Sequence, residues 1–173
     1  MKPKISILAT GRFLVGEGVR SIQSTLEELI NNAEREIVIA AYTISGGLKE
    51  FFNLLEKSAE KGVRITVIIN RFKSQPKRVV RYLKKLERDF EHVQIIDFAD
   101  PSGGDLHMKV IVVDRKIALL GSANLTWKGL VENHEMDILV EGSIVESMCK
   151  LLEKIENAYK RGLLSCKPLN ESI

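Results

Sequence analysis

Two residues with complementary chemistry, His107 and Lys109, stand two positions apart in the apolar run LHMKVIVV. The run has the composition and length of a β-strand. Side chains two positions apart on a strand share a face, so the imidazole and the ammonium are expected to project together. Met108 and Val110 are expected to point the other way, into packing. A nucleophile and a cation then stand side by side.

A second set of polar groups follows a predicted hairpin. The runs LHMKVIVV and KIALLG are joined by the short polar pair Asp114-Arg115, which predicts two antiparallel strands. Directly after the second strand the sequence reads Gly121-Ser122-Ala-Asn124. The Ser122 hydroxyl and the Asn124 amide can donate hydrogen bonds to phosphate oxygens. Together with the imidazole and the ammonium, these groups indicate chemistry on phosphate.

These residues form one pattern, H-x-K-x4-D-x6-G-S-x-N, running from His107 to Asn124. The pattern resembles the signature of the phospholipase D superfamily, and every fixed position is filled. Glu135 also stands where the small single-motif, homodimeric endonucleases of that superfamily carry a glutamate. The resemblance covers about residues 20 to 160, because AAYTI and the later EKGVRITVIIN look like the paired strands that precede the motif.

The resemblance implies a role for each polar residue. His107 would attack phosphorus and form a covalent phosphohistidine. Lys109 and Asn124, with Ser122, would hold the nonbridging oxygens and stabilise charge in the transition state. Glu135 would orient an imidazole by accepting its N–H. Neither a metal ion nor another cofactor is expected, because the lysine and the amide neutralise the phosphate.

Other conspicuous residues are expected to serve structure or to lie on the surface. Asp114 is fixed in the motif but falls at the hairpin turn, and Gly121 is likewise assigned to the framework of the motif. His134 is next to Glu135, so strand alternation turns it away from the site. His92 lies at the start of a predicted strand and is interpreted in the same way.

The chain contains only one copy of the motif. His92 and His134 are its other histidines, and neither is followed by a lysine two positions later. Two motifs are needed if the resemblance holds, so the second must come from another subunit, whose His107 would protonate the leaving oxygen and then activate water. Isologous twofold pairing brings identical motifs together, so a homodimer is expected.

A basic face on a predicted helix indicates a nucleic-acid partner. Four side chains at helical spacing fall opposite the apolar stripe and would either follow a phosphate backbone or simply be solvated. This basic face consists of Lys77, Arg81, Lys84 and Arg88. Trp127 would stack on a base or pack structurally. The net charge of +3 supports a polyanionic partner only weakly.

Helices and strands alternate along the predicted chain. Helical spacing of apolar residues covers 17–33, 48–61 and 76–90, and strand-like runs cover 36–44, 63–70 and 92–98. The hairpin, a strand over HEMDILVEG and a helix from about Ser143 to Arg161 complete the order. The apolar side of that last helix would carry Ile144, Met148, Leu151, Leu152 and Ile155. This order predicts an α/β fold, a layered α-β-α sandwich with a central mixed sheet, as in the phospholipase D superfamily.

Composition favours one ordinary globular catalytic domain over residues 1–173, with 45% hydrophobic and 28% charged residues. Cys149 and Cys166 lack a partner at metal-ligand spacing and are interpreted as free thiols in a reducing compartment. No segment approaches the length of a membrane span. A cytoplasmic protein without a membrane partner is therefore expected.

Three functions remain open. An endonuclease cleaving DNA or RNA is favoured by the small size, the single motif and the basic face. A phospholipase D or phosphatidyltransferase would share the chemistry, but the sequence shows no apolar interfacial loop or lipid anchor. A catalytically silent nucleic-acid-binding dimer is disfavoured by the intact motif.

Overall fold

The computed structural model describes residues 3–45 and 47–164. The first half of this range contains β1 (Lys4–Ala9), β2 (Arg20–Ser21), α1 (Ile22–Asn31), β3 (Glu36–Ala41), α2 (Lys49–Glu60), β4 (Arg64–Asn70) and the short 3-10 helix η1 (Phe72–Ser74). The second half contains α3 (Lys77–Asp89), β5 (Val93–Phe98), β6 (Lys109–Val113), β7 (Ile117–Gly121), the π-helical turn η2 (Lys128–Glu132), β8 (Met136–Glu141) and α4 (Ile144–Lys160).

The eight strands found in residues 3–45 and 47–164 belong to one mixed sheet, in the order β2-β1-β8-β7-β6-β3-β4-β5. β3, β4 and β5 run parallel, connected by α2 and α3, and β6 joins them antiparallel to β3. β7 and β8 continue the antiparallel part, and β1 pairs with β8. The predicted hairpin is therefore present, as β6 and β7.

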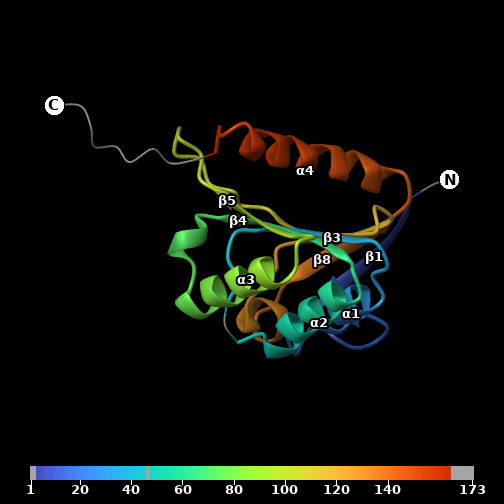
Figure 1. Ribbon diagram of the computed structural model, residues 1–173. Coiled ribbons are helices and arrows are strands. Elements are labelled where there is room, and N and C mark those ends of the chain that lie inside the picture. The colour runs from blue at the N-terminus through green and yellow to red at the C-terminus, as the bar shows by residue number, and fades with distance from the viewer. Residues whose placement is uncertain (1–2, 46, 165–173) are drawn as a thin grey trace.

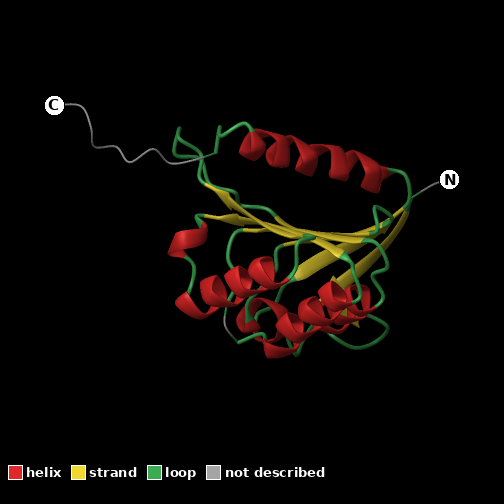
Figure 2. Cartoon of the chain, viewed as in Figure 1, coloured by secondary structure: helices red, strands yellow, loops and turns green. Residues whose placement is uncertain are grey.

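Helices cover both faces of the sheet, which gives three layers (Figure 1). α1, α2 and α3 lie on one face and α4 lies alone on the other, as Figure 2 also shows. Each face has its own hydrophobic cluster, because side chains alternate along each strand. In β3, for example, Ile37 and Ile39 pack toward α1 and α2, whereas Ala40 packs toward α4. The predicted layered sandwich with a central mixed sheet is confirmed.

Local sequence explains where the helices begin and end. Ser21 caps α1, since its Oγ accepts a hydrogen bond from the backbone N–H of Ser24. α2 ends just before Gly62, whose φ of +83° suits the residue that follows a helix. α3 follows Pro76 and buries Val79, Leu83 and Leu86.

Two features of the fold differ from the sequence prediction. β1 was not predicted, yet it occupies an inner position of the sheet between β2 and β8. In α4 the predicted apolar side is confirmed for Met148, Leu152 and Ile155, which pack on the sheet together with Val145 and Cys149, and it is wrong for Ile144 and Leu151. Ile144 and Leu151 are exposed.

The two cysteines fall in different parts of the chain. Cys149 is a buried free thiol, and burial raises its pKa. Cys166 lies outside the described residues. Within 3–45 and 47–164, no helix has both the length and the apolar character needed to cross a membrane.

Candidate active site

The polar residues of the motif gather at one edge of the sheet. β6 begins where β3 ends, with Lys109 opposite Ala41. β8 begins where β7 ends, with Asp137 opposite Gly121. Segments far apart in the sequence, around residues 42, 107, 122 and 135, therefore meet at this edge.

His107 lies two residues before β6, not on it. Its imidazole is exposed, and its Nδ1 is 3.4 Å from the Lys109 Nζ, which also donates to the His107 carbonyl at 3.2 Å. An ammonium donates and cannot accept, so Nδ1 of the neutral ring is the acceptor and the ring proton is assigned to Nε2. Met108 is 40% exposed, and its predicted packing is wrong because it lies outside both hydrophobic clusters.

Tyr42, which the sequence did not single out, supports the imidazole. Its backbone N–H donates to the Met108 carbonyl at 3.0 Å, so the β3–β6 pairing continues one residue beyond the strands. Its ring centroid is 4.6 Å from that of His107, at an interplanar angle of 59°. The Lys109 Nζ lies 5.8 Å from the same Tyr42 centroid. One aromatic ring thus contacts both the proposed nucleophile and the cation.

Asn70 at the end of β4 holds the segment that carries His107. Its buried amide accepts a hydrogen bond from the Leu106 backbone N–H at 2.9 Å and donates to Asp105 at 3.3 Å. Arg71 donates to the same Asp105 oxygen at 2.8 Å. The hydrogen bonds from Arg71 and Asn70 both lower the pKa of Asp105, and the bond from Arg71 has the larger effect. Asn70 could be recognised only once β4 and the segment before β6 were known to be neighbours.

Ser122 and Glu135 are bonded to each other. The Ser122 Oγ donates to Glu135 Oε2 at 2.5 Å, and the Asn133 side chain donates to Glu135 Oε1 at 3.0 Å. Among the described residues, neither carboxylate oxygen contacts an imidazole. In a single chain, the Ser122 hydroxyl therefore donates its proton to Glu135 and does not point it toward a bound phosphate.

Asn124 lies in a loop that returns to the end of β3. The loop pairs there, because Ser45 donates its backbone N–H to the Leu125 carbonyl at 2.9 Å. Across the described part of the chain, no hydrogen-bond partner is found for the buried Asn124 Oδ1. A buried acceptor without a partner is unfavourable, by about 1–3 kcal/mol.

Gly121 makes room for a buried carboxylate that the sequence did not reveal. A Cβ at Gly121 would lie 2.1 Å from Asp137 Oδ1 and 2.5 Å from the Asp137 Cα. Asp137 accepts the Ala123 backbone N–H at 3.1 Å and so shapes the start of the motif loop. Burial raises the pKa of Asp137, although backbone hydrogen bonds oppose the shift.

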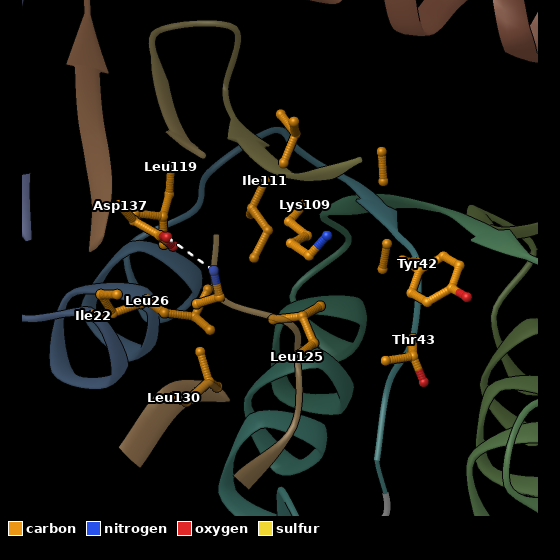
Figure 3. Close-up of a pocket in the computed structure, with 14 residues that line it drawn as sticks. Ile22, Leu26, Tyr42, Thr43, Lys109, Ile111, Leu119, Leu125, Leu130 and Asp137 are labelled. Carbon is orange, nitrogen blue, oxygen red and sulfur yellow. Dashed lines mark hydrogen bonds between the residues drawn. The ribbon is translucent and has the colours of Figure 1, made fainter. Parts of the chain in front are cut away.

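Lys109 and Asp137 also line a small cavity beneath the motif (Figure 3). Its volume is about 20 Å³, roughly what one water needs, and its other walls are mainly apolar. The aliphatic stem of Lys109 is thus enclosed while its Nζ reaches His107.

Asp114 lies at the opposite end of β6 from His107, with φ of +53° in the hairpin turn. Burial would raise the pKa of this carboxyl, but hydrogen bonds from the backbone N–H groups of Glu36, Glu34 and Arg35 outweigh it and hold the pKa below its usual value. The distances are 3.0, 3.0 and 2.8 Å. Asp114 joins the hairpin to the start of β3 and is too far along the strand to reach the His107 edge.

The remaining predicted residues lie on the surface. All four side chains of the basic face are exposed on α3. Trp127 is exposed beside a groove between α1 and α2, and its indole N–H donates to Glu132 at 2.9 Å. His134 is exposed and stacks on Phe13, whereas the half-buried His92 contacts the Ala59 carbonyl at 2.8 Å.

One expectation about loops is wrong. The sequence was interpreted as lacking an apolar loop, but Phe13, Leu14 and Val15 are exposed between β1 and β2. This loop lies beside Glu135, because Thr10 donates its backbone N–H to the Glu135 carbonyl.

Comparison with known proteins identifies the domain. The family model described as "Cardiolipin synthase, PLD-like domain" matches residues 26–161. The DISARM protein DrmC of Bacillus paralicheniformis is 28% identical over 156 residues, which are 90% of this chain and 65% of DrmC. Phospholipase D Z of Dictyostelium discoideum is 32% identical over 131 residues, covering 66% of this chain and 30% of its own length.

A third relative, 5'-3' exonuclease PLD3 of Rattus norvegicus, is 28% identical over 111 residues, 64% of this chain and 22% of the exonuclease. The chain therefore spans less than two thirds of the length of all three relatives. The names of a phospholipase and an exonuclease both denote phosphodiester hydrolases.

Solved structures share the fold. Nuc from Salmonella typhimurium, a phospholipase D family member, aligns with a TM-score of 0.71 at 17% identity, covering 90% of this chain and 95% of Nuc. NucT from Helicobacter pylori aligns with a TM-score of 0.70 at 21% identity, with the same two coverages.

Proposed function

Because the chain belongs to the family of phospholipase D-like domains, we propose that its residues 1–173 form one catalytic domain that hydrolyses DNA or RNA phosphodiesters without a metal ion. The observation that carries this proposal is the contact of His107 Nδ1 with Lys109 Nζ, 3.4 Å apart at an exposed edge. An imidazole beside a fixed cation is suited to attack on a phosphodiester. The basic face and the exonuclease name of one relative favour a nucleic acid over a lipid.

The proposed reaction has two steps. His107 attacks phosphorus through Nε2, and the bond from phosphorus to the leaving oxygen breaks as the partner's His107 donates a proton to that oxygen. Water then breaks the phosphorus–nitrogen bond and gives a proton to the partner's His107. One water is consumed, and an alcohol and a phosphomonoester are released. Lys109 and Asn124 would hold the nonbridging oxygens throughout.

We place the second copy of the chain against the exposed side chains on the α4 face of the sheet. Ile7 pairs with Ile138, which packs on the α4 side, so Ile7 faces the same way. Met136 and Met108 share that face because they precede Ile138 and Val110 by two residues. The exposed strip consists of Ile5, Ile7, Met108 and Met136. Apolar side chains gathered beside an incomplete site favour an isologous dimer interface.

A dimer also gives Glu135 the role expected from the family. Nucleophilic attack through Nε2 requires the imidazole proton on Nδ1, whereas in the lone chain Lys109 donates to Nδ1. A carboxylate that accepts the Nδ1 proton would select the reactive tautomer. We assign this role to the partner's Glu135.

The test combines substrates with a nucleophile variant. The purified chain is incubated with labelled single-stranded DNA, double-stranded DNA, RNA and phosphatidylcholine vesicles, with EDTA present, and its mass is measured by light scattering. We expect a dimer that cleaves nucleic acid. His107→Asn should keep the dimer and the affinity but lose at least about 10⁴-fold in cleavage, because attack and protonation fail together. Cleavage within tenfold of wild type, or a fully active monomer, would refute the proposal.

A lipid phosphodiesterase is the second candidate. The exposed apolar residues 13–15 beside Glu135 favour it, as does the family model named for cardiolipin synthase. Cleavage of the vesicle lipid with no cleavage of nucleic acid would select this candidate.

A further inference from the structure

The loop between β1 and β2 presents an apolar tip to solvent. Phe13 is 73% exposed, more than any other large apolar side chain in the described part of the chain, and Leu14 and Val15 are 44% and 43% exposed. Exposed apolar side chains that cluster beside a functional site usually mark a contact surface.

The base of this loop is fixed to the candidate active site. Thr10 donates its backbone N–H to the Glu135 carbonyl at 3.0 Å and accepts the Glu135 N–H through Oγ1 at 3.2 Å. The Thr10 hydroxyl donates to the Asn133 carbonyl at 2.7 Å. Gly11 has φ of +87°, and a Cβ there would lie 2.7 Å from the His134 ring. The base of the loop is therefore held next to Glu135, and the tip begins two residues after Gly11.

Phe13 is already part of a stack. Its ring lies at 18° to the His134 ring, with the centroids 5.4 Å apart. The Arg12 guanidinium lies 4.4 Å from the Phe13 centroid. The Phe13 ring thus stacks with the His134 ring, has the Arg12 guanidinium over it and is still mostly open to solvent. Proteins that bind single-stranded nucleic acids stack bases on exposed aromatic rings of this kind, with an arginine nearby.

We propose that Phe13, supported by His134 and Arg12, is a stacking subsite for an unpaired base next to the scissile phosphate. This inference rests on the proposed nuclease function and specifies its substrate: the nucleotide at this position is single-stranded, since a base inside a duplex has both faces covered by its stacked neighbours. Arg12 supplies the positive charge that a neighbouring phosphate requires. An acyl chain would need neither the parallel rings nor the cation on the ring.

The experiment compares two oligonucleotides of equal length, one with bases and one made entirely of abasic nucleotides. For Phe13→Ala we expect kcat/KM on the normal oligonucleotide to fall by about 5- to 150-fold, the range of one base–aromatic stack. On the abasic oligonucleotide the same variant should match wild type. Phe13→Trp should restore activity. Leu14→Ala, on the neighbouring exposed residue, is the matched control and should have no effect.

Several results would overturn the inference. An equal loss on both oligonucleotides would exclude a role in base contact. Vesicles of equal parts phosphatidylcholine and phosphatidylglycerol that bind wild type but not Phe13→Ala would identify a lipid anchor. A monomeric Phe13→Ala would identify a subunit interface. If wild type cleaves neither oligonucleotide, the proposed function fails and the subsite with it, whereas cleavage that is unaffected by Phe13→Ala refutes the subsite alone.

Discussion

Replacing Asp114 tests whether a residue fixed in the catalytic signature serves stability. Its carboxylate accepts backbone N–H groups from Glu34, Arg35 and Glu36, of which the Glu36 donor is buried. Hydrogen bonds to a charged group contribute about 1.5–3 kcal/mol each, but water can replace the acceptor at the two half-buried donors. The free energy of unfolding should therefore fall by about 3 kcal/mol in Asp114→Gly.

The glycine variant is chosen because Asp114 has a positive φ of +53°. Glycine adopts this conformation without strain, so Asp114→Gly isolates the loss of the carboxylate. Asp114→Ala should be less stable than Asp114→Gly by roughly a further 1 kcal/mol, the cost of an alanine in the left-handed region. For a domain of this size, 3 kcal/mol lowers Tm by roughly 6–12 °C.

Thermal unfolding followed by circular dichroism across pH checks the cause. The folded-state pKa of Asp114 lies below its unfolded value near 3.9, so its contribution is complete above that value and is lost as pH falls through the folded pKa. The difference in stability between wild type and Asp114→Gly should be constant near pH 7 and shrink below about pH 4. A variant that keeps the wild-type Tm but loses more than tenfold in kcat would refute the structural role.

Three further outcomes follow from the same geometry. Cleavage should persist in EDTA, since Lys109 and Asn124 supply the charge stabilisation, and restoration of lost activity by magnesium would contradict this. Asn70→Ala should lower kcat about 100-fold with little change in KM, because the segment before β6 loses the hydrogen bond that holds it. The control is Ser58→Ala, which removes a buried hydroxyl bonded to the Ile30 carbonyl and should lower stability only. Neutralising all four residues of the basic face should weaken nucleic-acid binding and reduce the dependence of that binding on salt concentration. Turnover of a small phosphodiester should stay normal. An unchanged salt dependence would show that the basic face is only solvated.

The sequence predicted the central strands well, because β3 and β4 are buried on both faces and consist of continuous apolar runs. β1 was not predicted. Its apolar residues do not form one buried run, because Ile5 and Ile7 face solvent whereas Leu8 and Ala9 are buried. Its place in the sheet depends on pairing with β8, which no local pattern encodes.

The residues of the candidate site also fall into two groups, those that the sequence revealed and those that it did not. The motif residues could be named because their types and spacing resemble the signature of a known family, and Glu135 was named from that resemblance alone. Tyr42 and Asn70 could not, because each acts through a neighbour that is distant in sequence, His107 in one case and Leu106 in the other. Asp137 was hidden because its burial depends on the absence of a side chain at Gly121 across the strand pair.

The pairing of β1 with β8 constrains the order in which the protein can be assembled during synthesis. β3, β4 and β5 are joined by short crossovers and can associate as soon as they leave the ribosome. Lys4 meets Glu141 across 137 residues, so β1 waits for the last strand, roughly 7–27 s at 5–20 residues per second. Until then the edge of β1 that faces β8 is unpaired, whereas its other edge can already pair with β2 at Arg20 and Ser21. An unpaired strand edge can pair with another chain, so this edge is open to wrong pairing until β8 has been synthesised. The pairing of β1 with β8 also brings Thr10 to Glu135, so the contact between the β1–β2 loop and the candidate site forms only after β8 has been synthesised.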